Sequence, residues 1–486
     1  MSKVNLFKYG LLAVIAVTLF TSFTFQGSRG LYESTEGRYA ECGLEMLTSG
    51  NYLVPTLNNV PHWTKPPLTY WAIASGIRIF GKNEWGVRIG NSIAFLISVI
   101  AVYFIAMTMW NKTVALYAGL IYATSPFAIV GVNSVSTDQL LTMWELLSVL
   151  CYWLFLRRGS GIWMSALGVC SGLAFLTKGP PGLLAVLVMI VFHLFSGKKL
   201  RKAGVLRVLI AITLFLVTGL SWYLYSVINN PDLLGYFLGK EVYARVFTDH
   251  FKRNPQWYAP LYVYGLPLIS GVGGWIICFR NGFKEIRTSY QGAGRFIRER
   301  KILFFLLIWF LLPLIVLSIS KSRLPLYVLP FFPAMVLIAA RLADKMKMKL
   351  KTLIFITIIS ATVCVGLKKY AQYVPSSSNM GSLYTTWLKN EKFEKFILFD
   401  TDAYYGIQFY THPRCIRTSV DADSQKNYQP IAQVLKSINP GSQVFLCTEN
   451  RNAAKLETLL PNDFDYSLKK KYRKISLYSA VKKMAL

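Results

Sequence analysis

Acidic and basic side chains gather in segment 31–71, which follows the first apolar run and carries Glu33, Glu36, Arg38 and Lys65. A carboxylate can accept a proton from an attacking hydroxyl, and a fixed cation can stabilise the charge on a leaving group. Because the surrounding sequence is mostly apolar, a polar segment here must face water or line a site. The alternative is that Glu36 and Arg38 lie on the solvated face of an amphipathic helix.

Asp138 is the second candidate, at the start of an apolar run in the stretch SVSTDQLLTMW. The pair Thr137-Asp138 is typical of a helix N-terminus, where such side chains cap free backbone N–H groups. An acid at a membrane edge is costly, so it also indicates a functional site. The two roles are compatible.

Segment 229–257 presents Glu241, Arg245 and His250 in order before a Pro-x-Trp-Tyr element. A guanidinium group can hold a phosphate through two parallel hydrogen bonds, which makes Arg245 a phosphate-binding candidate. The alternative for Glu241 and Arg245 is an i,i+4 pair that supports a helix. His250 could bind a metal or carry a proton, although a lone histidine is more often structural.

Further cations stand at predicted helix ends. Gly-Pro after Lys178 in TKGPPG breaks a helix there. The stretch SKSRLPLYVLP carries Lys321, Arg323 and Tyr327. Each is a site candidate, and the alternative is a simple helix terminus.

The composition is that of a polytopic membrane protein. Of 486 residues, 53% are hydrophobic and only 16% are charged, whereas soluble domains carry roughly 25% charged residues. The formal charge of +30 points to Lys and Arg held on the cytoplasmic side near anionic lipid, and not to nucleic acid. The seven cysteines make no zinc pattern, although Cys415 and Cys447 of the polar tail could pair.

The hydropathy pattern predicts about eleven membrane spans, with eleven to thirteen as the range, each of roughly 20 residues. The first is read as an uncleaved helix because it is long and lacks a small-residue cleavage site. Two short spans, 162–177 and 181–196, could be re-entrant or merged. The predicted spans are 6–25, 86–109, 113–132, 139–156, 162–177, 181–196, 204–228, 258–279, 302–320, 324–341 and 351–366.

Lys and Arg set the expected orientation. With the N-terminus inside, the basic clusters near 157–158, 198–207, 280–301 and 341–351 all fall on inside turns, and few basic residues fall on the short outside turns. This is a positive-inside pattern. An odd number of spans then puts the tail outside, and every candidate segment named above falls on that same outer face.

The tail differs in composition from the rest of the chain. Residues 395–400, 443–448 and 474–481 have strand patterns, and 431–438 and 453–460 have helical spacing. We therefore expect a transmembrane domain at 1–370, with outer loops 27–85 and 229–257, and a small soluble α/β domain at 371–486. The tail shows no Gly-rich phosphate loop and no metal cluster.

The order EGRYAE, an apolar helix face, NYLVP and KPPLTYW resembles the first extramembrane loop of the aminoarabinose-to-lipid A transferases. That family stands with the protein O-mannosyltransferases among the membrane-embedded C-type glycosyltransferases. The likeness covers roughly residues 30–340. It implies the C-type fold, a bacterial inner-membrane location, and an active site and tail domain on the periplasmic side.

The resemblance also implies residue roles. The family's Asp-Glu-x-Arg-Tyr-Ala-Glu appears here with Thr35 at the Asp position, so Glu36 becomes the expected carboxylate at the sugar, with Glu33 behind it. Asp138 matches an acid at the head of the fourth span. Lys65 and Arg245 match the residues that hold the donor phosphate, as do Lys321 or Arg323 and Tyr327 in the later turn.

A divalent metal is possible in this family, but the Glu of its Glu-Lys-Pro-Pro motif is Thr64 here, which weakens that expectation. No other cofactor is expected.

The expected function is that of an inverting glycosyltransferase. It moves a sugar from a polyprenyl phosphate, such as undecaprenyl phosphate, to an envelope acceptor, which is expected to be lipid A. A protein Ser/Thr acceptor is the alternative within the enzyme class. A lipid or sugar flippase is the alternative of another class, and flippases often show repeated halves that this chain lacks.

Overall fold

The computed structural model describes residues 9–195, 204–280, 293–472 and 474–484, with only the backbone for 293–299. Most of the basic cluster at 198–207 and much of that at 280–301 lie outside these residues. Contacts divide the chain into two compact units. We call them the helical unit (1–26, 64–69 and 88–369) and the mixed unit (27–63, 70–87 and 370–486).

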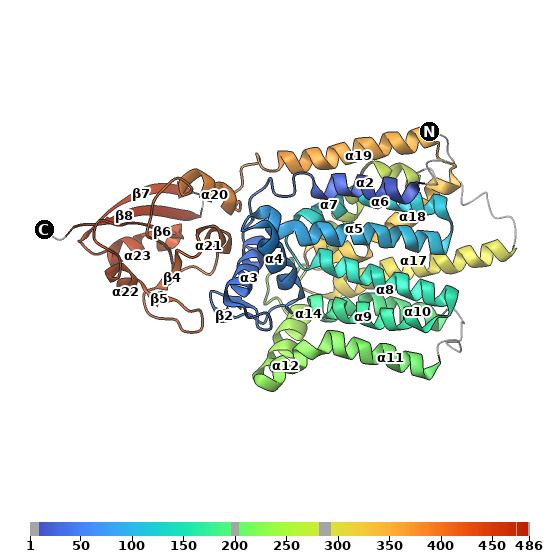
Figure 1. Cartoon of the computed structure of the whole chain (residues 1–486), viewed down its shortest axis with the longest axis horizontal. Coiled ribbons are helices and arrows are strands. Elements are labelled where there is room, and N and C mark those ends of the chain that lie inside the picture. Colours follow the sequence, from blue (N-terminus) through green and yellow to red (C-terminus); the bar gives the residue numbers. More distant parts are fainter. Residues whose placement is uncertain (1–8, 196–203, 281–292, 473, 485–486) are drawn as a thin grey trace. The chain divides into compact units, whose positions relative to one another are not determined.

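Within the described residues, seven helical segments are long and apolar enough to cross a membrane, or up to nine if each bent pair is one span. Two shorter apolar segments accompany them, α2 (Gly10–Phe23) and Pro180–Phe195, which contains α10 (Leu184–Phe195). All eleven predicted spans coincide with these segments, and the labelled helices can be followed in Figure 1. The seven are α5 (Glu84–Met109), α8 (Asp138–Arg158), α9 (Gly161–Lys178), Val205–Asn229 with α11 (Val205–Phe215) and α12 (Ser221–Asn229), Arg300–Ile319 of α17 (Ala293–Ile319), Pro325–Lys345 with α18 (Phe332–Lys345), and α19 (Leu350–Tyr370).

Two apolar helix pairs are bent, and their sequences explain the bends. Pro126 begins α7 (Pro126–Asn133) after α6 (Lys112–Ala123), and the two axes meet at 53°. Proline lacks the N–H that would continue the helical hydrogen bonds. Gly273 (φ +58°) follows the segment Leu261–Gly271, which includes α15 (Leu266–Gly271), and this break is 84°.

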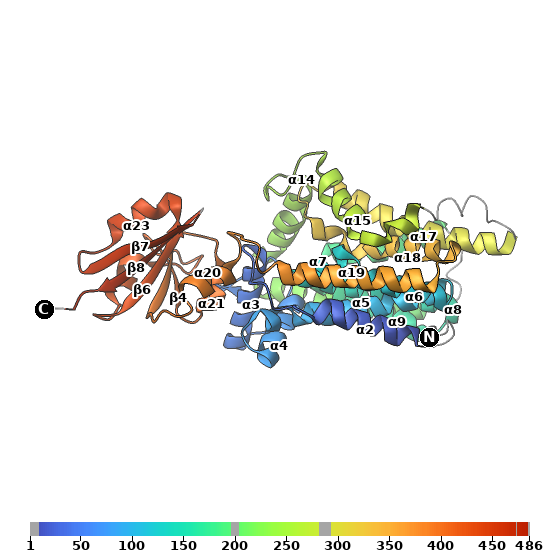
Figure 2. The same cartoon turned by 90° about the horizontal axis from the view of Figure 1, so that it is seen from above.

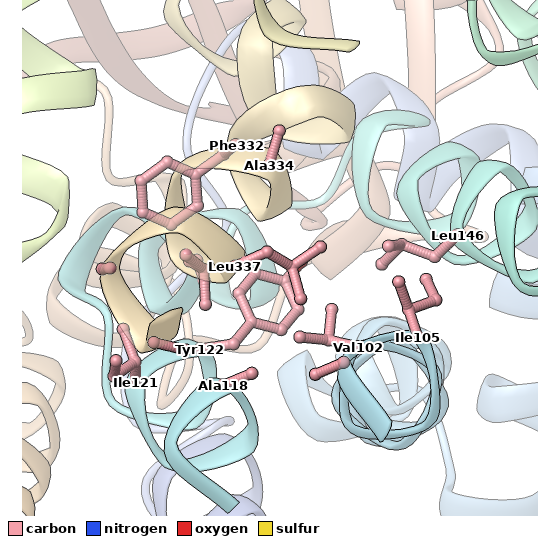
Figure 3. Packing of buried hydrophobic residues seen from close by; sticks show 14 of the residues in the cluster. Val102, Ile105, Ala118, Ile121, Tyr122, Leu146, Phe332, Ala334 and Leu337 are labelled. Atoms are coloured by element: carbon pink, nitrogen blue, oxygen red, sulfur yellow. The ribbon is translucent and has the colours of Figure 1, made fainter. Parts of the chain in front are cut away.

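The core of the helical unit lies where α5, α6, α8 and α18 meet. Tyr122 of α6 points toward Val102 of α5 and Leu337 of α18 (Figure 3). Its ring centroid is 6.4 Å from that of Phe332. Since these side chains are buried within protein, the apolar sequence here packs helices together and does not only face lipid.

The mixed unit contains a six-stranded sheet with the strand order β5-β4-β3-β6-β8-β7. β3 pairs in parallel with both β4 and β6, and β8 pairs antiparallel with β6 and β7. The predicted tail strands and helices are confirmed. The elements are α20 (Met380–Trp387), β3 (Lys395–Phe399), α21 (Tyr405–Thr411), β4 (Cys415–Ser419), β5 (Gln429–Pro430), α22 (Ile431–Lys436), β6 (Gln443–Glu449), α23 (Ala453–Leu459), β7 (Phe464–Tyr472) and β8 (Ile475–Lys482).

The sheet is covered on both faces, as the alternation of β3 requires. Ile397 and Phe399 pack with residues of α22 and α23, and Phe396 and Leu398 pack with residues of α20 and α21. Figure 2 shows α23 and α21 beside the strands. Cys415 and Cys447 lie on β4 and β6 as free thiols, so the disulfide that the sequence allowed does not form.

Most of the first loop belongs by its contacts to the mixed unit, whereas residues 64–69 belong to the helical unit. The loop contains α3 (Thr35–Ser49), the two-stranded ribbon of β1 (Thr56–Leu57) and β2 (Val60–Pro61), and most of α4 (Leu68–Phe80). Gly50 ends α3 in the left-handed conformation (φ +71°), which glycine adopts without steric cost. The predicted boundary between a membrane domain at 1–370 and a soluble domain at 371–486 stays a prediction.

Candidate active site

Lys65, Glu241 and Arg245 form one buried charge cluster in the helical unit. Lys65 Nζ donates to Glu241 Oε2 at 3.0 Å, and Arg245 Nη2 donates to the same oxygen at 2.6 Å. The three side chains are 12–16% exposed. Two cations therefore share one carboxylate, and the cluster has a net positive charge when Lys65 is protonated. Sequence spacing predicted the i,i+4 pair of Glu241 with Arg245 but gave no partner for Lys65.

The backbone around this cluster is unusual. Residues Tyr236–Ala244 form a π-helical stretch between α13 (Asp232–Gly235) and α14 (Arg245–Phe247). π-Helical segments are rare and often mark functional sites. Arg245 directly follows the stretch, and its guanidinium lies 4.3 Å from the ring centroid of Phe251. Glu241 and Arg245 are thereby held on one side of an irregular helix.

The protonation state of Lys65 depends on opposing effects of its surroundings. Its pKa is lowered to about 7, because burial and the neighbouring Arg245 disfavour the charged form more than Glu241 favours it. Lys178 also contributes to the lowering, which places Lys178 within electrostatic range of Lys65. A bound anion would favour the charged form of Lys65. The cluster is therefore suited to a ligand that brings negative charge.

Asp138, Lys178 and Tyr327 make a second group in the same unit. Lys178 Nζ donates to Asp138 Oδ1, and the two side chains are 9% and 7% exposed. Lys178 Nζ also lies 4.1 Å from the ring centroid of Tyr327. Asp138 stands in the first turn of α8, where Ser136 Oγ donates to Oδ2 at 3.0 Å. Thr137 makes no side-chain cap, so the Asp138 carboxylate is held by Lys178 and Ser136.

The remaining cations of the later turn have different surroundings. Arg323 is 4% exposed and donates to the carbonyl oxygens of Asn254, Gln256 and Ser318, each at 2.8 Å. It therefore fastens segment 254–256 to the turn at 318–323. Lys321 is 45% exposed and lies 3.4 Å from the exposed Asp249. His250 is exposed.

Glu36, Glu33 and Arg38 lie in the mixed unit. Glu36 is 5% exposed, and its two oxygens accept from Arg29 at 2.8 and 2.9 Å. It also accepts from the backbone N–H of Tyr32 at 2.8 Å. Glu33 Oε2 accepts from Gly406 N at 3.0 Å, and burial raises the pKa of Glu33. The predicted role of Glu36 at the sugar stays a prediction, as does its pairing with Asp138.

Sequence reasoning missed two residues. Arg29 precedes segment 31–71 and pairs with Glu36 through a bidentate contact that only the fold creates. Glu145 is 2% exposed on α8, and its Oε1 has no hydrogen-bond partner among the described residues. The sequence could have indicated Glu145, because an acid inside an apolar span is rare and by default suggests a functional residue. Glu145 is two helical turns from Asp138 and within electrostatic range of Lys178.

No group of three His, Cys, Asp or Glu side chains that could hold a metal occurs in the part of the chain that the structure describes. At the position of the family's Glu, Thr64 contributes a backbone carbonyl that accepts from Lys65 Nζ at 2.8 Å. These residues do not fit a divalent cation, because the centre of the cluster is itself cationic.

The family model for dolichyl-phosphate-mannose-protein mannosyltransferase matches residues 64–223. An undecaprenyl phosphate-α-4-amino-4-deoxy-L-arabinose arabinosyl transferase of Proteus mirabilis is 33% identical over 355 residues, which is 70% of this chain and 61% of that protein. The corresponding Yersinia enterocolitica protein is 32% identical over 353 residues, which is 69% of this chain and 60% of that protein. The resemblance to the aminoarabinose transferases is confirmed. The matched region spans about three fifths of each of these two transferases.

The solved structures agree on the fold. The aminoarabinose transferase ArnT from Cupriavidus metallidurans, in its structure with undecaprenyl phosphate, matches with a TM-score of 0.74 and 18% identity over 96% of this chain and 97% of that one. The oligosaccharyltransferase of Archaeoglobus fulgidus matches with a TM-score of 0.53 and 11% identity over 93% and 71%. The chain thus has the fold of these structures, and it is a multi-pass helical membrane protein with a C-terminal sheet domain.

Proposed function

We propose that the protein is an inverting glycosyltransferase that moves a sugar from undecaprenyl phosphate to lipid A. The observation that carries the proposal is the shared carboxylate, since Lys65 and Arg245 both donate to Glu241 Oε2. Lys65 and Arg245 bring two buried positive charges against the one negative charge of Glu241. Positive charge therefore remains for a phosphate ligand. The names of the Proteus and Yersinia relatives support the choice of donor and sugar.

The reaction is a single displacement. An acceptor oxygen forms a bond to the anomeric carbon as the bond from that carbon to the phosphate oxygen breaks, and the electron pair leaves with undecaprenyl phosphate. Fixed cations stabilise the charge that grows on the phosphate, so Lys65 and Arg245 act on the leaving group. Because that phosphate is a weak base, it needs no general acid.

The carboxylates act on the acceptor and not on the leaving group. A hydroxyl acceptor requires a base, which Glu36 or Asp138 would supply. A phosphate of lipid A is already ionised, and with that acceptor the carboxylates orient the sugar or its amino group. Lys178 holds Asp138 in either case, because their ion pair is buried in the helical unit.

The membrane arrangement belongs to the proposal. Eleven spans carry the chain across the bacterial inner membrane, with the N-terminus in the cytoplasm. The outer loops 27–85 and 229–257 and the domain at 371–486 are periplasmic, which places the candidate residues where lipid A can reach them. The Lys and Arg bias supports this orientation.

The test is sugar transfer by the purified protein in liposomes that contain lipid A. Undecaprenyl phosphate-linked aminoarabinose is offered beside matched donors that carry a hexose. We expect mass spectrometry to detect lipid A heavier by one aminoarabinose and release of undecaprenyl phosphate. Movement of the donor across the bilayer without any transfer would support a flippase and contradict the proposal.

Transfer to protein is the second candidate, and the match of residues 64–223 to the mannosyltransferase model favours it. A comparison of envelope proteins between a deletion strain and its parent separates the two. Loss of a sugar from Ser or Thr peptides with unchanged lipid A would replace the lipid acceptor by a protein acceptor.

A further inference from the structure

Helix α3, which carries the first-loop acids, is joined to the C-terminal sheet domain within the mixed unit. The chain before the helix runs along the start of α20, where Glu33 N donates to the carbonyl of Ser378 at 2.7 Å. Met380 N donates in return to the carbonyl of Leu31 at 3.0 Å. Tyr410 OH of α21 accepts from Leu31 N at 2.9 Å. The segment before α3 is therefore joined to the tail by an isolated antiparallel bridge between Tyr32 and Asn379.

The helix itself meets α21 at two glycines. A Cβ placed on Gly37 of α3 would lie 2.2 Å from the backbone N of Gly406. No heavy atom can be accommodated at that distance, so the two backbones approach only because Gly37 has no side chain. A Cβ on Gly406 would instead lie 2.7 Å from Met380 Cγ of α20. This contact fixes how close α3 lies to the sheet domain and which face it presents there.

Two buried carboxylates, those of Glu33 and Glu41, then fix the position of α3 along α21. Glu33 Oε2 accepts from Gly406 N at 3.0 Å, and Glu41 Oε1 accepts from Gln408 Nε2 at 3.1 Å. Gln408 Oε1 accepts from Arg417 Nε at 2.7 Å, and Arg417 is 2% exposed on β4. A chain of hydrogen bonds thus runs from α3 into the sheet.

The contact between α3 and α21 lies near the loop that follows β3. Arg417 also donates to the carbonyl oxygens of Thr401 and Ala403, at 2.6 and 2.8 Å, in the loop that follows β3. That loop lies at the carboxyl end of a parallel strand, and open α/β sheets bind their ligands at this end. In this protein the first loop, which contains α3, packs against α21. Helix α21 is the helix that follows the loop after β3.

We propose that the sheet domain is the positioning device for α3. It holds the helix through the Gly37–Gly406 contact and the Glu33 and Glu41 carboxylates, and so fixes where the first-loop acids stand. Glu33 is on this account a positioning residue that touches no substrate. The proposal deepens the proposed function and rests on it for its effect on turnover, but the docking of α3 can be tested without any reaction.

The test compares Gly37→Leu with Gly366→Leu in the full-length protein. Gly366 lies on α19, and an added Cβ there meets nothing within 4 Å. Hydrogen exchange is followed at α3, α21 and β6. We expect Gly37→Leu to speed exchange in α3 at least tenfold while β6 stays protected, and Gly366→Leu to change neither. Turnover should fall at least tenfold in Gly37→Leu with the donor KM changed less than threefold.

Glu33 gives the second comparison. Glutamine keeps an oxygen that can accept from Gly406 N, whereas alanine removes it. We expect Glu33→Ala to speed exchange in α3 and to lower turnover, and Glu33→Gln to recover most of both losses. If Glu33→Gln is as inactive as Glu33→Ala while α3 stays protected, Glu33 acts in chemistry and the proposal is overturned.

The remaining outcomes are also decisive. Unchanged exchange of α3 in Gly37→Leu, or full turnover with α3 released, overturns the proposal. If the parent protein transfers no sugar, the proposed function fails, and the exchange measurements still decide whether the sheet domain holds α3.

Discussion

Lys65 and Glu241 are 176 positions apart in the chain, yet Lys65 Nζ lies 3.0 Å from Glu241 Oε2. This ion pair brings the motif KPPL of the first loop to the π-helical stretch Tyr236–Ala244, which Arg245 follows. It turns two separate sequence candidates into one cationic cluster, and four of the five predictions below concern the groups predicted to surround the donor.

The first prediction is that donor binding depends on pH through Lys65. Its pKa is lowered to about 7, so the cation is present below pH 7 and is lost as the pH rises above it. A sugar phosphodiester keeps its single charge over this range. Donor affinity should therefore fall by up to about tenfold per pH unit above pH 7, until the pKa of Lys65 in the donor complex is reached.

Lys65→Arg is the matched variant for this measurement, because a guanidinium stays charged at every pH used. Calorimetric titration of the donor between pH 6 and pH 9 should give a sloping line for the parent and a nearly flat one for Lys65→Arg. Equal slopes in the two proteins would assign the pH dependence to another group.

The second prediction concerns the loss of each phosphate contact. Lys65→Ala and Arg245→Ala each remove a charge-assisted contact worth roughly 1.5–3 kcal/mol, which is about 10- to 150-fold in donor affinity. Lys240→Ala is the control, since Lys240 is an exposed cation of the same π-helical stretch. Normal affinity and turnover in both cluster variants would make the phosphate assignment wrong.

The third prediction concerns Glu36. Glu36→Gln should lower turnover about 10²- to 10⁴-fold if Glu36 is the base, while Thr35→Ala should do little. The variant also leaves Arg29 buried without its carboxylate, so the melting temperature must be measured with the rate. Arg29→Gln combined with Glu36→Gln removes both charges and should restore stability but not turnover. Recovery of both in the double variant would make the pair structural.

The fourth prediction concerns Asp138 and Lys178. Breaking a buried ion pair from one side typically costs about 3–5 kcal/mol of unfolding free energy, so Asp138→Asn should be both less stable and less active. The double variant Asp138→Asn with Lys178→Met should regain much of the stability and remain inactive. An active double variant, tested for sugar transfer in liposomes, would remove Asp138 from the reaction.

The fifth prediction is the orientation. A cysteine at Asn51 in the first loop or at Ser424 in the tail should react with an impermeant thiol reagent applied to spheroplasts, and one at Arg157 should not. Cys170 and Cys415, the two partly exposed native thiols, are changed to serine in all three proteins. Labelling at 157 without labelling at 51 would invert the topology and with it the location of the site.

Hydropathy predicted the positions of the apolar helices well, because burying some 20 apolar residues in a bilayer is a local property of the sequence. The same holds for the tail strands, whose short apolar runs coincide with β3, β6 and β8. The pair of Glu241 with Arg245 was also readable, since four residues along a helix bring two side chains to one face.

The sequence by itself thus determined the membrane class, the tail elements and the residue types of the candidate site. Only the tertiary structure decided that Lys65 shares Glu241 with Arg245, that Arg29 holds Glu36, and that the first loop is built into the sheet domain through Gly37 and Gly406. These contacts join positions from 7 to 369 residues apart. Local propensity carries no information on such pairings, because they form only when packed helices and strands bring distant side chains together.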